Sequence, residues 1–206
     1  MRLKKIVRGA SFPADLPLPR EKHCFPVLLL QNKGEREVTS AAQDAASWLA
    51  NPRATRETLE AFGLATKHRL GQNFLVEDNI IRKIIRLAEL TSDDVVLEVG
   101  PGLGTLTVAM LVYVRAVCSI EADCELEGVL ATTCKEPHQD SFVLCMGDAL
   151  KATPQLVGDA YASLGVFADT QGKEASGALI GPNKFVSNLP YQVAATLILL
   201  FFQEFT

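Results

Sequence analysis

Four consecutive residues near the end of the chain have the composition of a site that acts on an amine. They are Asn188, Leu189, Pro190 and Tyr191. The Asn188 side-chain oxygen and the Leu189 backbone carbonyl can both accept from an exocyclic amino group, which aims its nitrogen lone pair at an incoming methyl group. Pro190 holds the backbone, and Tyr191 offers a face on which a flipped base can stack. The run predicts amino-group methylation, and an ordinary turn after a strand is the alternative.

A glycine-rich turn supplies the second candidate site. Glu98, Gly100, Gly102 and Gly104 form the pattern E-x-G-x-G-x-G between a β-branched run and a helical run. Glycines let the backbone turn tightly and approach a ligand closely. The spacing differs from the dinucleotide pattern G-x-G-x-x-G, and the early acid can hold a water or the amino-acid end of S-adenosylmethionine. The turn favours a methyltransferase, and a tight turn without a ligand is the alternative.

Two more acids follow later predicted strands. Glu121 lies 17 residues beyond Gly104, where a carboxylate can accept both hydroxyls of a ribose. Asp148, in the sequence Gly147-Asp148-Ala149, can accept from an adenine amino group. The alternatives are a solvated acid at a strand end and an aspartate that caps or turns the chain.

Alternating strand and helix patterns define the elements that position these residues. Predicted strands cover residues 94–99, 116–120, 141–145 and 184–187. Predicted helices cover residues 40–50, 54–62, 105–112, 125–132, 154–164 and 193–205, with a further helix N-capped by Asp78 whose apolar stripe runs from Ile80 to Leu87. The alternation predicts an α/β fold, with a parallel, doubly wound sheet that has helices on both faces and stops after its fourth strand.

The chain is predicted to have one domain and a tail. Residues 1–40 carry four prolines and no periodicity, which predicts a poorly ordered extension. Residues 41–206 form the predicted domain, and the Gly- and Ser-rich residues 165–183 are predicted to be a surface loop.

Composition limits the class of protein. The chain has 206 residues, 48% of them apolar and 21% charged, enough to bury a core. The net charge of -4 weighs mildly against nucleic acid, but residues 51–86 carry seven Lys or Arg against four acids. That basic stretch indicates either a solvated helix face or a nucleic-acid contact.

Cysteines and hydropathy indicate the compartment. None of the five cysteines is paired in C-x-x-C spacing, which argues against a zinc site or a disulfide framework. No signal-peptide pattern is found, and no apolar run reaches the roughly 18 residues of a membrane helix. We therefore expect a cytoplasmic protein with reduced cysteines, no metal and no membrane segment.

One more motif narrows the family. Residues 67–75, K-H-R-L-G-Q-N-F-L, resemble the G-Q-N-F-L signature of the rRNA adenine N6-dimethyltransferases. With the four motifs above, the chain from about residue 47 onward resembles the small-subunit branch, the KsgA family. The resemblance implies a Rossmann-like class I methyltransferase that transfers methyl groups from S-adenosylmethionine to two adjacent adenosines of small-subunit (16S-type) rRNA.

The resemblance also implies roles for particular residues. It assigns cofactor contacts to Asn73, Leu75, Gly100, Glu121, Asp148 and Asn188. It assigns contacts with the target adenine to Asn188, Leu189 and Tyr191. It assigns contacts with rRNA phosphates to basic residues that include Lys67, Arg69, Arg82 and Lys83. The implied partner is small-subunit rRNA or the pre-ribosomal small subunit, and we expect a monomer. The resemblance places the family's later strands and helical C-terminal domain beyond residue 206, so we expect the domain in residues 41–206 to be incomplete.

Three other functions stay open at this point. The large-subunit rRNA methyltransferase of the macrolide-resistance type shares Q-N-F-L and Asn-x-Pro-Tyr, but Gly71 and Leu189 favour the small-subunit branch. A ribosome-binding fragment without catalysis is the second. A methyltransferase of a small molecule or a protein amine is the third, and G-Q-N-F-L argues against it.

Overall fold

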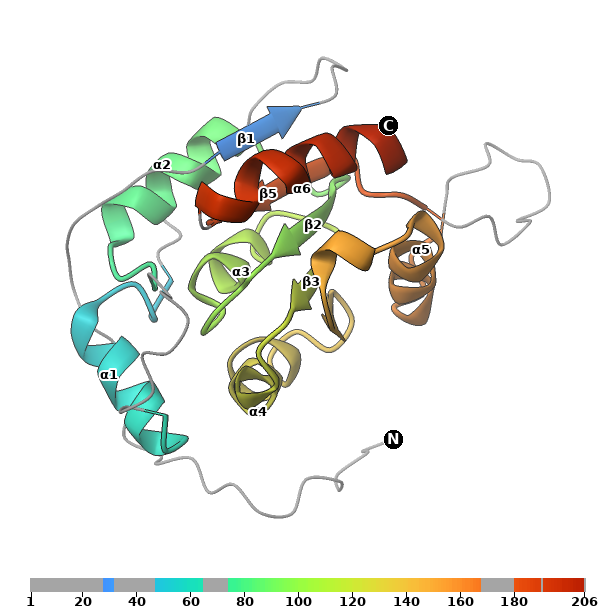
Figure 1. Cartoon of the computed structure of the whole chain (residues 1–206). Coiled ribbons are helices and arrows are strands. Elements are labelled where there is room, and N and C mark those ends of the chain that lie inside the picture. Colours follow the sequence, from blue (N-terminus) through green and yellow to red (C-terminus); the bar gives the residue numbers. More distant parts are fainter. Residues whose placement is uncertain (1–27, 32–46, 65–73, 168–179, 190, 206) are drawn as a thin grey trace.

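A five-stranded sheet forms the centre of the molecule, in the order β1-β5-β2-β3-β4 (Figure 1). The computed structural model describes residues 28–31, 47–64, 74–167, 180–189 and 191–205, and only the backbone at 28–31, 191 and 192. The strands are β1 (Leu28–Gln31), β2 (Val95–Val99), β3 (Ala116–Glu121), β4 (Phe142–Met146) and β5 (Lys184–Ser187). Strands β5, β2, β3 and β4 run parallel, and β1 runs antiparallel to β5.

Helices cover both faces of this sheet. They are α1 (Pro52–Ala61), α2 (Asp78–Ala88), α3 (Thr105–Met110), α4 (Glu127–Leu130), α5 (Pro154–Ser163) and α6 (Tyr191–Glu204). A π-helical turn, η3 (Ala131–Lys135), continues α4, and two 3-10 turns are η2 (Cys124–Leu126) and η4 (Ala149–Lys151). Buried residues of α2, α3 and α4 pack on one face, and those of α5 and α6 pack on the other.

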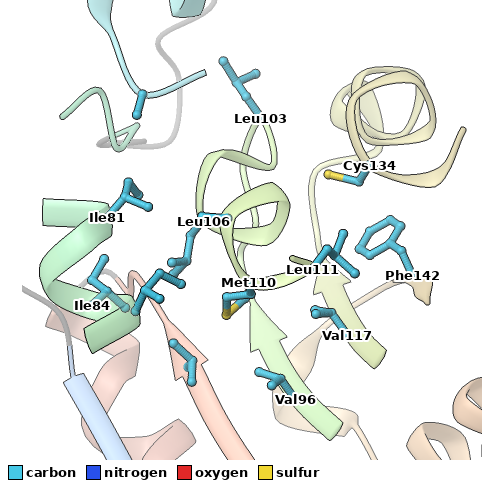
Figure 2. Close-up of a cluster of buried hydrophobic side chains, with 14 of the residues drawn as sticks. Ile81, Ile84, Val96, Leu103, Leu106, Met110, Leu111, Val117, Cys134 and Phe142 are labelled. Atoms are coloured by element: carbon cyan, nitrogen blue, oxygen red, sulfur yellow. The ribbon is translucent and has the colours of Figure 1, made fainter. Parts of the chain in front are cut away.

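The strands alternate between the two cores. Val96 and Val117 point into the cluster that Ile81 and Ile84 of α2 share with Leu106 and Met110 of α3 (Figure 2). Their neighbours Val95, Leu97 and Cys118 lie in the cluster beneath α5 and α6. Strands buried on both faces read as continuous apolar runs, as in residues 95–97. The predicted parallel sheet with helices on both faces is therefore confirmed.

The edge strand β1 adds one antiparallel strand to the four parallel strands that were predicted. It lies within residues 1–40, which were predicted to be poorly ordered, and it makes the sheet mixed rather than wholly parallel. Without it β5 would carry a row of unpaired backbone groups, because β5 pairs with β2 on one side only. Pairing from Leu28↔Ser187 to Gln31↔Lys184 satisfies that edge. The rest of residues 1–40 lies outside the described residues.

The first two helices differ from the predicted ones at their ends. Residues 47–50 of the predicted helix 40–50 form a turn, and residues 40–46 lie outside the described part of the chain. Asp78 is the first residue of α2 and not its N-cap, a position that Glu77 holds without a side-chain hydrogen bond. The reason is that Asp78 Oδ2 accepts from Arg82 Nε, 2.7 Å away and one turn onward. Leu87 was predicted to end the apolar stripe of this helix, but it is 51% exposed and lies outside the buried face of α2.

A buried ion pair joins the starts of β2 and β5. Lys184 Nζ lies 3.0 Å from Asp94 Oδ2 and also donates to the carbonyls of Ala88 and Glu89 at the end of α2. Asn183 donates from Nδ2 to Asp94 Oδ1 at 2.7 Å and accepts from the Val95 backbone at 2.9 Å. This network holds the amino-terminal ends of β2 and β5 together. The candidate site lies at the other, carboxyl-terminal ends of the strands.

Candidate active site

The predicted site residues follow four neighbouring parallel strands at the same edge of the sheet. Gly100 follows β2, Glu121 ends β3, Asp148 follows β4 and Asn188 follows β5. Backbone hydrogen bonds continue past the strands, from Gly100 N to Ile120 O at 2.9 Å and from Gly147 N to Glu121 O at 2.7 Å. In open parallel sheets the crevice outside the carboxyl ends of the strands is where ligands bind.

The glycine turn requires glycine at each predicted position. Gly100, Gly102 and Gly104 have φ of 67°, 61° and 87°, a region that disfavours a Cβ atom. A Cβ on Gly104 would also collide with the Cys134 sulfur, and one on Gly102 would lie 3.2 Å from the Phe74 ring. A Cβ on Gly100 would meet nothing within 4 Å. The turn is therefore packed from behind at Gly102 and Gly104 and open at Gly100.

Glu121 connects this turn to the end of β3. Its Oε2 accepts from Gly102 N at 3.3 Å and its Oε1 from Asp123 N at 2.9 Å. Burial raises the pKa of the Glu121 carboxyl, and the backbone N–H groups partly offset that rise. Each carboxylate oxygen has a second lone pair, so the acid can still accept from ligand hydroxyls. The position predicted to hold a ribose is thus oriented by the glycine turn.

Glu98 lies deeper than its predicted role requires. Its side chain is 1% exposed, and Oε2 accepts from Thr107 Oγ1 at 2.7 Å and from Ser119 Oγ at 2.6 Å. Burial raises the pKa of Glu98 to about 7, and the two hydroxyls act in the opposite direction. The carboxylate therefore joins β2, β3 and α3 beneath the glycine turn. This geometry supports an indirect role in shaping the turn over direct contact with a cofactor.

The Asn188 loop is attached to the glycine turn through Ser187. The Val99 N–H donates to Ser187 Oγ at 2.8 Å, and Ser187 is 1% exposed. The next residues along the two strands, Gly100 and Asn188, are thereby held side by side. Asn188 is half-buried, and Leu189 packs against the cluster beneath α5 and α6. The amide predicted to orient an amine thus borders the turn predicted to bind the methyl donor.

Asp148 caps a helical turn, as in the alternative to cofactor binding that the sequence left open. Its Oδ1 accepts from Leu150 N at 3.0 Å as the N-cap of η4, and its Oδ2 lies 3.6 Å from Lys151 Nζ. The side chain is 48% exposed, so capping leaves it accessible to a ligand. Its predicted contact with an adenine amino group stays a prediction.

Several predicted residues lie outside the described part of the chain. They are Lys67, Arg69, Asn73 and Pro190, together with the side chain of Tyr191, the first residue of α6. Leu75 is half-buried against the core of α2 and α3. Its neighbour Phe74 packs against Gly102, which places the end of the 67–75 segment beside the glycine turn. Lys83 is exposed on α2, whereas Arg82 pairs with Asp78.

Sequence reasoning missed the residues that support the site. Thr107, Ser119 and Ser187 are buried hydroxyls that hold Glu98 and Val99, and Phe74 closes the back of Gly102. Small hydroxyl residues within apolar strands and helices were the available signal, because a buried hydroxyl needs a partner. Their partners lie 9 to 88 residues away, which no local pattern reveals.

Comparison with known proteins assigns the family. Residues 63–206 match the model of the ribosomal RNA adenine dimethylase family. The chain belongs to that family. It is 40% identical over 159 residues to the ribosomal RNA small subunit methyltransferase A of Natranaerobius thermophilus, covering 76% of this chain and 50% of that protein. The protein of the same name from Opitutus terrae is 39% identical over 143 residues, covering 69% of this chain and 45% of that relative.

The match is partial in length. The chain spans about half the length of the curated relatives it matches. Among solved structures, a dimethyladenosine transferase from Plasmodium falciparum has 25% identity and a TM-score of 0.43, covering 61% of this chain and 37% of that one.

Among the described residues, no three His, Cys, Asp or Glu side chains cluster so as to hold a metal ion. Within the same part of the chain, no helix has the length and apolar character needed to cross a membrane.

Proposed function

We propose that the chain carries the methyl-transfer site of an rRNA adenine N6-dimethyltransferase that acts on small-subunit rRNA. The observation that carries the proposal is the Ser187–Val99 hydrogen bond, 2.8 Å long, which attaches the residues before Asn188 to the strand that leads into the glycine turn. Membership of the ribosomal RNA adenine dimethylase family supports the same reaction. The curated relatives are named for the small subunit, which favours that rRNA over the large-subunit alternative.

The residues present fit S-adenosylmethionine. The open side of Gly100 lets the backbone approach a ligand. Glu121, 6% exposed, offers a carboxylate at the tip of β3, and Asp148 offers one beyond β4. Glu121 would accept the ribose hydroxyls, Asp148 the adenine amino group, and Asn73, Leu75 and Gly102 would complete the contacts. When bound, the cofactor supplies an electrophilic methyl group.

Asn188 and its neighbours would prepare the target amine. The Asn188 amide oxygen and the Leu189 carbonyl accept from the two amine hydrogens, which draws the nitrogen toward tetrahedral geometry and frees its lone pair. Tyr191 stacks on the extruded adenine, and Pro190 fixes the loop. No dedicated base is needed, because the amine proton becomes acidic as the new N–C bond forms and passes to water.

RNA binding would use the basic residues that precede β2. Lys67 and Arg69 adjoin the segment that reaches the glycine turn, and Lys83 is exposed on α2. Arg82, which pairs with Asp78, is the fourth basic residue of this proposed set. Such contacts neutralise phosphates and position the RNA without reading its sequence. Two adjacent adenosines of 16S-type rRNA are the proposed targets, the chain acting as a monomer on the pre-ribosomal small subunit in the cytoplasm.

The decisive experiment measures methyl transfer from labelled S-adenosylmethionine to small ribosomal subunits that lack the modification. We expect N6,N6-dimethyladenosine in the digested rRNA. Asn188→Ala should reduce transfer about a hundredfold or more, the usual loss when one group oriented toward a transition state is removed. Gln155→Ala, on the exposed face of α5, is the control.

The experiment also separates the alternatives. A folded chain that binds small subunits without transferring methyl groups would favour the non-catalytic ribosome-binding fragment. Transfer to large-subunit rRNA, or to free amines alone, would refute the small-subunit assignment.

A further inference from the structure

Two cysteines on neighbouring strands form a pair beside the candidate active site. Cys118 of β3 and Cys145 of β4 place their Sγ atoms 3.8 Å apart. Both lie in the cluster beneath α5 and α6, where Cys118 is fully buried and Cys145 is half-buried. They are 27 residues apart in the chain, so cysteine spacing did not reveal them.

The two thiols have different environments. The hydrogen bond with Cys118 lowers the pKa of Cys145 to about 7, although burial acts in the opposite direction. The same hydrogen bond, together with burial, raises the pKa of the Cys118 thiol. A thiolate is the reactive form of cysteine, so the more exposed Cys145 is the nucleophile and Cys118 is its protonated neighbour.

We propose that Cys118 and Cys145 form an oxidisable dithiol, which a hydroperoxide converts into a disulfide joining β3 to β4. The Cys145 thiolate attacks the O–O bond of the hydroperoxide. An S–O bond forms, the O–O bond breaks, and the departing oxygen takes a proton and leaves as water or alcohol. The Cys118 sulfur then attacks the sulfenic sulfur, the S–S bond forms, and the hydroxyl leaves as water with the Cys118 proton. The two sulfurs together lose two electrons, which reduce the O–O bond.

Closure of the disulfide must bring the two sulfurs together, which we expect to shift β3 relative to β4. The register pairs Cys118 with Val143 and Cys145 with Ile120, so the cysteines are diagonal neighbours on one face. A disulfide bond is about 2.05 Å long. The sulfurs, 3.8 Å apart, must therefore approach by about 1.8 Å to reach that length.

The strand movement would reach the cofactor site. Cys118 lies three residues before Glu121, and Cys145 lies three residues before Asp148. Glu121 is oriented by backbone N–H groups of Gly102, in the turn after β2, and of Asp123, just beyond β3, and Asp148 is oriented by that of Leu150, just beyond β4. Oxidation should therefore change the spacing of the two acids and weaken S-adenosylmethionine binding. This consequence rests on the proposed function, whereas disulfide formation does not.

The first experiment maps the disulfide in the complete chain. The reduced protein is treated with hydrogen peroxide, remaining thiols are blocked with N-ethylmaleimide, and peptides are analysed by mass spectrometry. We expect a linked Cys118–Cys145 peptide pair that has lost the mass of two hydrogen atoms and is restored by dithiothreitol. Cys124→Ser, which removes the exposed cysteine of η2, should keep this link. Cys118→Ser, which keeps a hydroxyl donor for Cys145 but has no second thiol, should leave sulfenic acid at Cys145.

Other products would overturn the proposal. Cys145 oxidised to sulfenic or sulfinic acid in the wild-type chain, without a link to Cys118, would show that the sulfurs do not meet. A link through Cys124 instead would show that another pair reacts. No oxidation at either cysteine would show that the pair is inert.

The second experiment measures S-adenosylmethionine affinity by calorimetry for the reduced and oxidised chain. We expect oxidation to weaken binding at least about fivefold, the lower end of couplings between sites, and to have no effect in Cys145→Ala. Equal affinities would reject the coupling and leave the disulfide standing. If the reduced chain does not bind the cofactor, the proposed function fails, and the mapped disulfide still decides the redox proposal.

Discussion

The Gly102 N–H donates to Glu121 Oε2 at 3.3 Å, while Asp123 N donates to Oε1 of the same carboxylate at 2.9 Å. Both oxygens therefore face backbone donors, one from the glycine turn after β2 and one from the residues after β3. An amide in this place would turn its NH2 group toward one of those N–H groups. The geometry specifies a carboxylate at the tip of β3.

Glu121→Gln should weaken S-adenosylmethionine binding. The substitution removes the charge that strengthens hydrogen bonds to ligand hydroxyls, each worth about 1.5–3 kcal/mol, and it disturbs the glycine turn. We expect the dissociation constant measured by calorimetry to rise roughly tenfold or more, in proportion to that loss. Asp159→Asn, on the exposed face of α5, is the matched control. Unchanged affinity in Glu121→Gln would reject the ribose-binding role.

Glu98 should make stability depend on pH. Its folded-state pKa of about 7 lies above the ordinary 4.5, so between these values the folded protein keeps a proton that the unfolded chain releases. The Glu98 contribution to the free energy of unfolding is therefore most favourable below pH 4.5. It falls as pH rises toward 7 and is constant above that value.

Glu98→Gln should flatten this pH dependence. Glutamine is neutral at every pH, and its oxygen can accept from Thr107 and Ser119 as the carboxylate does. We expect a smaller drop in Tm between pH 5 and pH 8, the interval that spans the upper pKa of about 7, in melts followed by circular dichroism. Glu136→Gln, at an exposed glutamate, should retain the wild-type profile. Identical profiles in all three proteins would show that Glu98 does not titrate in this range.

Ser187→Ala should lower turnover by misplacing the Asn188 loop. The substitution leaves the Val99 N–H without its acceptor, which costs about 1–3 kcal/mol of stability when the group stays buried. Because Ser187 acts through its neighbours, we expect kcat to fall while the KM for S-adenosylmethionine changes little. Ser187→Thr keeps the hydroxyl and should restore turnover. Ser163→Ala, at the end of α5, is the control, and a loss confined to KM would contradict the positioning role.

Lys184→Met should destabilise the fold strongly. The substitution leaves the Asp94 carboxylate, 4% exposed, without its cation and removes a donor from the carbonyls that end α2. Breaking a buried pair costs about 3–5 kcal/mol, and the remaining bonds to Asp94 from Thr91 and Asn183 favour the lower value. Urea denaturation measures the loss.

The control for Lys184 is the surface pair of Arg53 and Glu57 on α1. Arg53→Met should leave the urea midpoint within experimental error, because exposed pairs contribute little. The double variant Lys184→Met/Asp94→Asn should recover part of the stability, since it no longer buries an unpaired charge. A Lys184→Met protein as stable as wild type would show that the pair is not needed.

The sequence by itself determined the four parallel strands, the helices on both faces and the order of the site residues along the sheet edge. These features follow from local signals, namely apolar runs such as residues 95–97 and the glycines that end β2. A strand buried on both faces needs no knowledge of its partner to be recognised. The motifs around Gly100, Glu121 and Asn188 were recognisable for the same reason.

Only the tertiary structure decided which side chains meet. The pairing of β1 with β5, the burial of Glu98 and the bond from Val99 to Ser187 depend on strand register. The approach of Cys118 to Cys145 depends on it as well. A shift of register by one residue would turn these side chains to the other face of the sheet. Contacts between residues 21 to 88 positions apart are set by packing of the whole domain, which no local pattern contains.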